Sequence, residues 1–500
     1  MAEIKKSGDQ FGSRLGLIAA MLGMAVGTGN IWRFPREVAS NNGGAFILMC
    51  FIALFIWAVP LICAESVFGK KSRMANAGGF KAMLGEKYTW MGTFTAIVNA
   101  LLGAYYVVVV GWCLKYLVII TTGFLSTVRE GGVEMTTQYF TNFALTAPSY
   151  ESWVWFIVGI AICSIAVFRG IQGGIETANK VMIPMVFILL VVLLVRVLCM
   201  PGAVKGLEFM YHVDPKDFGN PRIWLNAFTQ AAWSSGAGWG MFHIYFIYSA
   251  KDEDIELNAV TATFGDMVAA MLAGMVVLPT VFALTPNADA VKEVLGSCAN
   301  VLTFIHLTNL FAHTTGGYIM GVLFFLALLS AAVSSVIAMI ETGTRNLMDM
   351  GFSRTKGTLC TALFFAVAGS YSAIDNRFFN NQDMVWGVAL LMVGLLYAIG
   401  AMKYGVDKLW NEDIAPCSDI NIKWMWSVIK LFPLEFLFVW GWWMWDAKSW
   451  YPGEWFKFWP PIKYQYTPGS MVVEWIIVFA ICFALNSYLS KRLIYSNKID

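Results

Sequence analysis

Charged residues are scarce in this chain of 500 residues. Only 13% are Asp, Glu, Lys or Arg, whereas soluble proteins carry about 25%. The nine cysteines include no CxxC pair, which argues against a disulfide framework or a zinc site. The four histidines stand at no metal-ligand spacing and belong to no recognisable nucleophile–base pair. The composition therefore argues against an enzyme.

Long apolar stretches fill most of the chain instead. About 20 apolar residues suffice to cross a bilayer as a helix, and 58% of this chain is apolar. Twelve stretches qualify: 14–37, 43–69, 90–124, 152–168, 176–199, 223–249, 257–285, 316–349, 357–373, 384–404, 424–447 and 470–490. The sequence therefore predicts an all-α, polytopic (multi-pass) integral membrane protein with twelve transmembrane helices embedded in a lipid bilayer.

Lysine and arginine gather on one side of these segments. When the N-terminus is placed in the cytoplasm, Lys70 falls on the same side as Lys491 and Arg492, as the positive-inside rule requires. We therefore expect both termini to be cytoplasmic, in a plasma (inner) membrane. Residues 1–13 are polar, and we expect no cleavable signal. The net charge of +2 says little about partners. No nucleic-acid partner is expected.

Glycines interrupt the first apolar segment. Gly23, Gly27 and Gly29 closely precede Asn30, and each Gly in a helix costs about 1 kcal/mol relative to Ala. Backbone that leaves the helix at membrane depth is tolerated only where protein buries it or where it lines a cavity. The segment therefore predicts a broken helix at a binding site.

The sixth segment repeats this pattern, because Gly236, Gly238 and Gly240 follow Ser234. Interrupted helices at corresponding positions of two halves are typical of secondary transporters built from repeats. The expected transport domain covers 1–500, with five-helix repeats at 14–199 and 223–404 and two appended helices at 424–490. In a broken helix, free amides suit a carboxylate and free carbonyls suit a cation.

The residues at the first break resemble a family signature. Residues 25–35 read AVGTGNIWRFP and residues 42–46 read NGGAF, and both are similar to the neurotransmitter:sodium symporters. The resemblance extends from about residue 10 to about residue 400. It implies the LeuT fold, a 5+5 inverted repeat with broken helices 1 and 6, and sodium as the coupled ion at two sites.

The resemblance implies a first sodium site made by Ala25, Asn30, Ser234 and Asp266. Family members often have Asn in place of Asp266, and chloride-dependent members have a Tyr and a Ser in place of Cys50 and Ala270. A carboxylate beside sodium could supply the negative charge that chloride supplies elsewhere. We therefore expect no chloride requirement. A carboxylate within the membrane is a functional candidate on its own account.

The second sodium site and the substrate site follow from the same resemblance. The implied second site comprises Gly23, Val26, Ala331, Ser334 and Ser335. The implied substrate site comprises Ala25, Gly27, Gly29, Leu102, Tyr106, Val109, Trp233, Ser234, Gly236, Trp239, Ser335 and Met339. Monoamine carriers have an aspartate where this chain has Gly27, so the resemblance favours an amino acid. Trp233 in place of Phe and Gly236 in place of Ser favour an apolar or aromatic one.

Two gates are also implied. Arg33 and Asp383 match the external pair that closes over the site, and Tyr248 and Asp349 match the cytoplasmic gate. The basic residue that completes the cytoplasmic gate in the family is replaced by Gly8, for which Lys5 or Lys6 could substitute.

Taken together, the sequence predicts a sodium-coupled symporter that imports an amino acid by alternating access. Two alternatives stay open. One is a proton-coupled LeuT-fold amino-acid carrier, with Asp266 as the proton site. The other is a membrane amino-acid sensor that binds without transporting, which the lack of a signalling domain disfavours.

Overall fold

The computed structural model describes residues 10–493, and this part of the chain is helical and contains no strand. Within it, nine spans are long and apolar enough to cross a membrane, by length and composition. They contain α3 (Gly44–Ala53) with α4 (Val59–Ser72), α6 (Thr89–Thr121), α8 (Tyr150–Phe168), α9 (Thr177–Leu198), α13 (Ile255–Leu284), α17 (Gly317–Asp349), α18 (Arg354–Ile374), α19 (Asn376–Tyr404) and α23 (Pro468–Arg492).

The first and eleventh predicted segments are bent helix pairs. The first consists of α1 (Arg14–Ala25) and the helical stretch Gly29–Ser40, which includes α2 (Phe34–Ser40), at an angle of 51°. The eleventh consists of Lys423–Lys430 and α22 (Phe432–Ser449), at 58°. Both are candidate spans in their own right. The predicted break in the first segment is therefore confirmed.

The sixth predicted segment is broken as well. Helix α11 (Pro221–Ser234) stops before residues 235–240, and α12 (Met241–Ile247) resumes after them. Gly236, Gly238 and Gly240 have φ angles of +68°, +84° and +79°, a left-handed conformation that favours glycine. With this segment, all twelve predicted apolar stretches contain helices.

The connections between these spans also carry helices. A third bent pair, α14 (Ala288–Gly296) with Ala299–Ala312, turns through 118°. It lies within 286–315, between the seventh and eighth predicted segments, and passes the same test of length and composition as the other two pairs. Helices α7 (Phe124–Phe140) and α10 (Ala203–Tyr211) lie between the third and fourth and between the fifth and sixth predicted segments.

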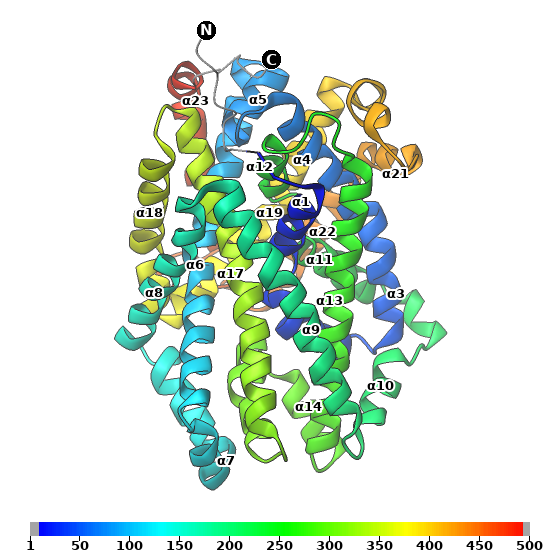
Figure 1. Ribbon diagram of the computed structural model, residues 1–500, viewed down its shortest axis with the longest axis vertical. Coiled ribbons are helices and arrows are strands. Elements are labelled where there is room, and N and C mark those ends of the chain that lie inside the picture. The colour runs from blue at the N-terminus through cyan, green and yellow to red at the C-terminus, as the bar shows by residue number, and fades with distance from the viewer. Residues whose placement is uncertain (1–9, 494–500) are drawn as a thin grey trace.

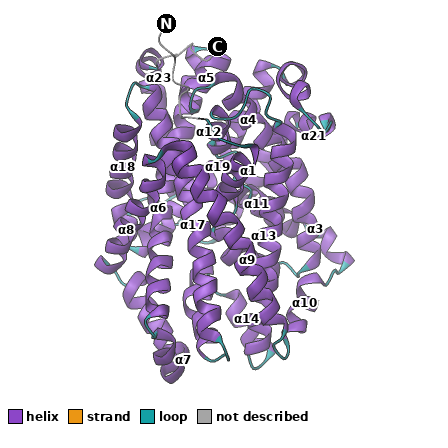
Figure 2. Ribbon diagram, in the orientation of Figure 1, coloured by secondary structure: helices purple, strands orange, loops and turns teal. Residues whose placement is uncertain are grey.

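The helices form one elongated bundle, with α5 (Asn76–Leu84) at one end and α14 at the other (Figures 1 and 2). We call these the α5 end and the α14 end. The C-terminal turn of α23 lies at the α5 end, where Lys81 Nζ donates to the carbonyl of Ser490 at 2.5 Å. Helix α1 packs against α9, α13 and α17, and α12 packs against α4. Both broken helices therefore lie against long helices of the bundle.

Candidate substrate and ion site

A cavity of about 620 Å³ lies where the two helix breaks meet. Every predicted substrate-site residue lines it except Gly236. A Cβ on Gly236 would contact the side chain of Met24 at 3.5 Å, and Met24 itself lines the cavity. The methionine therefore covers the position that the sequence assigned to Gly236. The lining continues through Asn300, Trp450 and Tyr466, so the cavity extends toward the α14 end.

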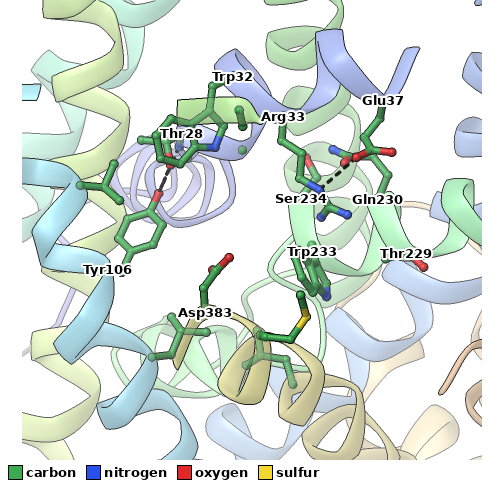
Figure 3. A pocket seen from close by; sticks show the side chains of 18 of the residues that line it. Thr28, Trp32, Arg33, Glu37, Tyr106, Thr229, Gln230, Trp233, Ser234 and Asp383 are labelled. Atoms are coloured by element: carbon green, nitrogen blue, oxygen red, sulfur yellow. Dashed lines mark hydrogen bonds and ion pairs between the residues drawn. The ribbon is translucent and has the colours of Figure 1, made fainter. Parts of the chain in front are cut away.

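Tyr106 on α6 closes one side of this cavity against the first break (Figure 3). Its hydroxyl accepts a hydrogen bond from the backbone amide of Thr28 at 3.1 Å and lies 2.8 Å from Thr28 Oγ1. A Cβ on Gly27 would stand 3.1 Å from this hydroxyl and 3.2 Å from Ser335 Oγ. The absence of a side chain at Gly27 thus keeps the backbone of the break open to the cavity.

Three predicted residues of the first sodium site lie together. Asn30 Nδ2 donates to Asp266 Oδ1 at 2.6 Å and to Ser234 Oγ at 3.1 Å, and Ser234 Oγ donates to Asp266 Oδ2 at 2.8 Å. Asn30 Oδ1 accepts from the Gly27 amide at 2.9 Å. Asp266 is 1% exposed. This buried carboxylate ties the first, sixth and seventh segments to one another beside the cavity.

Four of the five predicted residues of the second sodium site, Gly23, Ala331, Ser334 and Ser335, also lie together. Ser335 Oγ on α17 faces the carbonyls of Gly23, Met24 and Ala331 at 3.4, 3.3 and 3.2 Å. Ser334 Oγ donates to the carbonyl of Ala331 at 3.0 Å. The contact to Met24 was not predicted. Oxygen atoms of α17 and of the last turn of α1 therefore share one buried site.

At the α14 end, the two predicted gate residues line the same cavity without forming an ion pair with one another among the described residues. Arg33 lies 3.7 Å from Glu37 Oε1, and its guanidinium carbon stands 4.1 Å above the ring of Trp233. Asp383 points into the cavity from another wall (Figure 3). Glu37 was not predicted, although its spacing of four residues from Arg33 on a helix would have indicated the contact.

At the α5 end, the predicted gate residues belong to a larger cluster. Tyr248 donates to Glu341 Oε1 at 2.5 Å, and Arg354 Nη1 pairs with Glu341 Oε2 at 2.7 Å. Arg345 pairs with Asp349 at 3.3 Å and lies 5.6 Å from the Tyr248 ring. Lys5, Lys6 and Gly8 lie outside the described residues.

Sequence reasoning missed Glu341 and Arg354 at this end. Glu341 is an acid inside an apolar helix and is 0% exposed. Such a residue marks a functional or paired site, so the signal was present in the sequence. Arg354 stands at the start of the following helix, where nothing in the local pattern distinguishes it from a surface charge.

Comparison with known proteins agrees with this geometry. Residues 8–129 and 144–491 match the sodium:neurotransmitter symporter family. An uncharacterised sodium-dependent transporter of Methanocaldococcus jannaschii is 30% identical over 440 residues, which cover 84% of this chain and 87% of that one. The sodium-dependent neutral amino acid transporter B(0)AT3 of Mus musculus is 23% identical, over 85% of this chain and 83% of that one.

A solved structure has the same fold. The crystal structure of MhsT in complex with L-phenylalanine superposes with a TM-score of 0.75 at 27% identity, and the match covers 86% of this chain and 98% of that one. The predicted LeuT fold is thereby confirmed, and these relatives are transporters rather than enzymes. The chain is a multi-pass membrane transporter and belongs to the sodium:neurotransmitter symporter family.

Proposed function

We propose that this protein is a symporter that imports an apolar or aromatic amino acid together with sodium. The observation that carries the proposal is that Asn30 and Ser234, which line the cavity at the two helix breaks, both bond the buried carboxylate of Asp266. Hard oxygen atoms suit a sodium ion, and free backbone amides at a helix break suit a carboxylate. A bound amino acid would place its carboxylate between the free amides and the sodium ion and would contact both.

The walls of the cavity support the substrate class. Leu102, Val109 and Met339 supply apolar surface, and Trp233 and Trp239 supply aromatic surface. Gly27 brings no carboxylate to pair with a cationic amine. The mouse relative carries neutral amino acids by name, and MhsT was solved with L-phenylalanine. Tyr106 and the amides of the first break would hold the substrate carboxylate.

Two sodium ions would bind beside this substrate. The first would take Ala25, Asn30, Ser234 and Asp266, and the second would take Gly23, Val26, Ala331, Ser334 and Ser335. Asn30 Oδ1 accepts a hydrogen bond from the Gly27 amide at 2.9 Å, and this bond would have to break before the oxygen could bind the first ion. The Asn30 side chain would then turn its Nδ2 away from Asp266, and the sodium ion would take its place beside the carboxylate.

Chloride would not be required. Asp266 brings a fixed negative charge to the first sodium site, as chloride does in other members. A small buried cavity beside it is lined by Cys50, Gln230 and Ala270. The Cys50 thiol and the Ala270 methyl group replace two hydroxyl donors of chloride-dependent members. This leaves the Gln230 amide and the Ser234 hydroxyl, which already donates to Asp266 at 2.8 Å, as donors in this lining.

The two ends would alternate in opening to the solvent. The protein would lie in the plasma membrane. If both termini are in the cytoplasm, the α5 end faces the cytoplasm and the α14 end faces the outside of the cell. The cavity extends toward the α14 end, whereas buried ion pairs hold the α5 end together. Both observations support an outward-open state. Arg33 with Asp383 would close the first end, and the cluster of Tyr248 and Asp349 would part at the second.

The test is uptake into proteoliposomes, combined with thermal stabilisation of the purified protein by each of the twenty amino acids. A bound ligand raises the apparent stability by mass action. We expect stabilisation by a subset of apolar or aromatic amino acids that requires sodium, and uptake driven by a sodium gradient. Uptake at low pH without sodium would favour the proton-coupled alternative. Binding without flux would favour the sensor.

Asp266→Asn tests the role of the carboxylate. Wild-type uptake is expected to be the same in chloride and in gluconate. The variant is expected to lose at least tenfold in apparent sodium affinity, about 1.4 kcal/mol, and to recover part of it when chloride is added. A wild-type protein that stops transporting without chloride would refute chloride independence while leaving sodium coupling intact.

A further inference from the structure

The side chain of Asn179 lies against α1 at the second sodium site proposed above. Asn179 stands in the first turn of α9 and is 0% exposed. Its Nδ2 donates to the carbonyl of Ile175 at 2.9 Å. Its Oδ1 has no hydrogen-bond partner among the described residues. A buried amide oxygen without a donor is destabilising, so such a group calls for an explanation.

The position of this oxygen is fixed by Gly23. A Cβ on Gly23 would overlap Asn179 Oδ1 and would stand 3.2 Å from the Cβ of Ser334. The amide oxygen therefore occupies the space that a side chain at position 23 would fill. The carbonyl of the same residue, Gly23, faces Ser335 Oγ at 3.4 Å. Helices α1, α9 and α17 thus bring oxygen atoms to the same small region.

The acid that directly precedes α9 is already engaged. Glu176 accepts from the amide of Gly12 at 2.7 Å, from Ser13 Oγ at 3.1 Å and from Lys180 Nζ at 2.5 Å. It lies nearly one turn before Asn179, against the start of α1. Its charge is therefore balanced where it is, whereas the Oδ1 of Asn179 has no hydrogen-bond partner among the described residues.

We propose that Asn179 supplies its amide oxygen to the sodium ion of the second site. The inference rests on the proposed function and adds a ligand from α9 to the set from α1 and α17. A neutral amide oxygen suits a hard cation, as the carbonyl and hydroxyl oxygens already assigned there do. The bound ion would hold α9 against α1, and departure of the ion would release that contact.

The test replaces Asn179 in the full-length protein and measures sodium directly. For Asn179→Ala, we expect the sodium concentration at half-maximal thermal stabilisation to rise about tenfold, and binding of radioactive sodium to weaken by the same factor. Asn179→Asp keeps an oxygen and adds a charge, so it is expected to bind sodium at least as tightly as the wild type. If Asn179→Ala does not fold, Asn179→Asp still tests the proposal, because a sodium affinity about tenfold weaker than that of the wild type would contradict it.

Asn258→Ala is the matched control. Asn258 is also buried, its Nδ2 also donates to a carbonyl four residues back, Asp254 at 2.6 Å, and its Oδ1 also has no partner among the described residues. It stands at the start of α13, and its substitution is expected to leave the sodium half-saturation unchanged.

Two outcomes would overturn the inference. One is an Asn179→Ala protein with the sodium half-saturation of the wild type, and the other is an Asn179→Asp protein that loses as much sodium affinity as Asn179→Ala. A wild-type protein that shows no sodium response at all would instead refute the proposed function.

Discussion

The two ends of the cavity differ in how their charged residues are paired. At the α14 end, Arg33 reaches Glu37 on its own helix and stacks on Trp233, while Asp383 stays on a separate wall. At the α5 end, Glu341 joins Tyr248 and Arg354, which belong to different segments. One end is therefore held by a pair within one helix and a stacking contact to a second helix, and the other by buried contacts between helices.

This difference indicates which end is costly to open. An ion pair four residues apart on a helix contributes about 0.3–0.5 kcal/mol when it is exposed. Arg33 and Glu37 are 20% and 15% exposed and lie at a long distance of 3.7 Å, so Arg33 can exchange partners at a small cost. Breaking a buried pair by removing one member costs about 3–5 kcal/mol. The α14 end can therefore close by small side-chain movements, whereas the α5 end opens only when a buried cluster is disrupted. Alternating access would require the binding of substrate and ions to offset the free energy of disrupting that cluster.

The largest expected effect comes from Glu341→Gln. The substitution removes the charge that pairs with Arg354 at 2.7 Å, inside a helix where Glu341 is 0% exposed. The α5 end should then open in a larger fraction of molecules. Hydrogen–deuterium exchange of the backbone around Tyr248, whose carbonyl accepts from the Phe11 amide at 3.1 Å, should become at least tenfold faster.

Glu412→Gln is the control for this experiment. Glu412 pairs with Lys71 at 3.3 Å at the same end, but its side chain is 50% exposed. Exchange around Tyr248 should not change in this variant. Equal exchange in the two variants would mean that the buried cluster does not hold the α5 end closed.

An intermediate effect is expected from Gly387→Ala on α19. A Cβ there would stand 3.2 Å from Cζ2 and 3.3 Å from Cη2 of Trp233, which is tighter than ordinary contact. The indole would have to move, and Arg33 blocks it on one side at 4.1 Å. Overpacking of this kind costs about 1–3 kcal/mol, so we expect amino-acid affinity to fall about tenfold in a binding assay.

The double variant Gly387→Ala with Trp233→Phe decides whether the indole is the cause. The smaller ring leaves room for the added methyl group, so amino-acid affinity should return toward that of Trp233→Phe alone. Gly441→Ala is the control, because a Cβ on Gly441 would meet nothing within 4 Å. Failure of the second substitution to rescue the first would locate the effect elsewhere in α19.

Much of this architecture could be predicted from the sequence. The break in the sixth segment follows from local chemistry, because glycines at 236, 238 and 240 adopt positive φ angles that other residues avoid. The placement of Asn30 beside Asp266 followed from the family signature. It could not follow from spacing, since the two residues are brought together only by the packing of separate helices.

The rest depended on how side chains are oriented. Gly236 lies behind Met24 rather than at the cavity, because a flexible methionine side chain fills that space. The cluster around Glu341 joins residues from three segments, and no one-dimensional pattern gives the direction in which Arg354 points. The helices within 286–315 are short and meet at a bend of 118°. The sequence pattern therefore contains no single long apolar helix that would have revealed them.

The smallest expected effect comes from Glu37→Gln at the α14 end. The Arg33–Glu37 distance of 3.7 Å is long for an ion pair, so the lost stabilisation should be below about 1 kcal/mol. Arg33 would then turn more often toward Asp383 and close over a bound substrate, and dissociation of a radiolabelled amino acid should slow about two- to threefold.

Trp233→Phe weakens the second contact that holds Arg33 away, the stacking at 4.1 Å. If the two contacts act independently, their effects on dissociation multiply in the double variant. A double variant no slower than Glu37→Gln would mean that Glu37 alone keeps Arg33 from Asp383, and dissociation that becomes faster would show that the local pair helps to close this end.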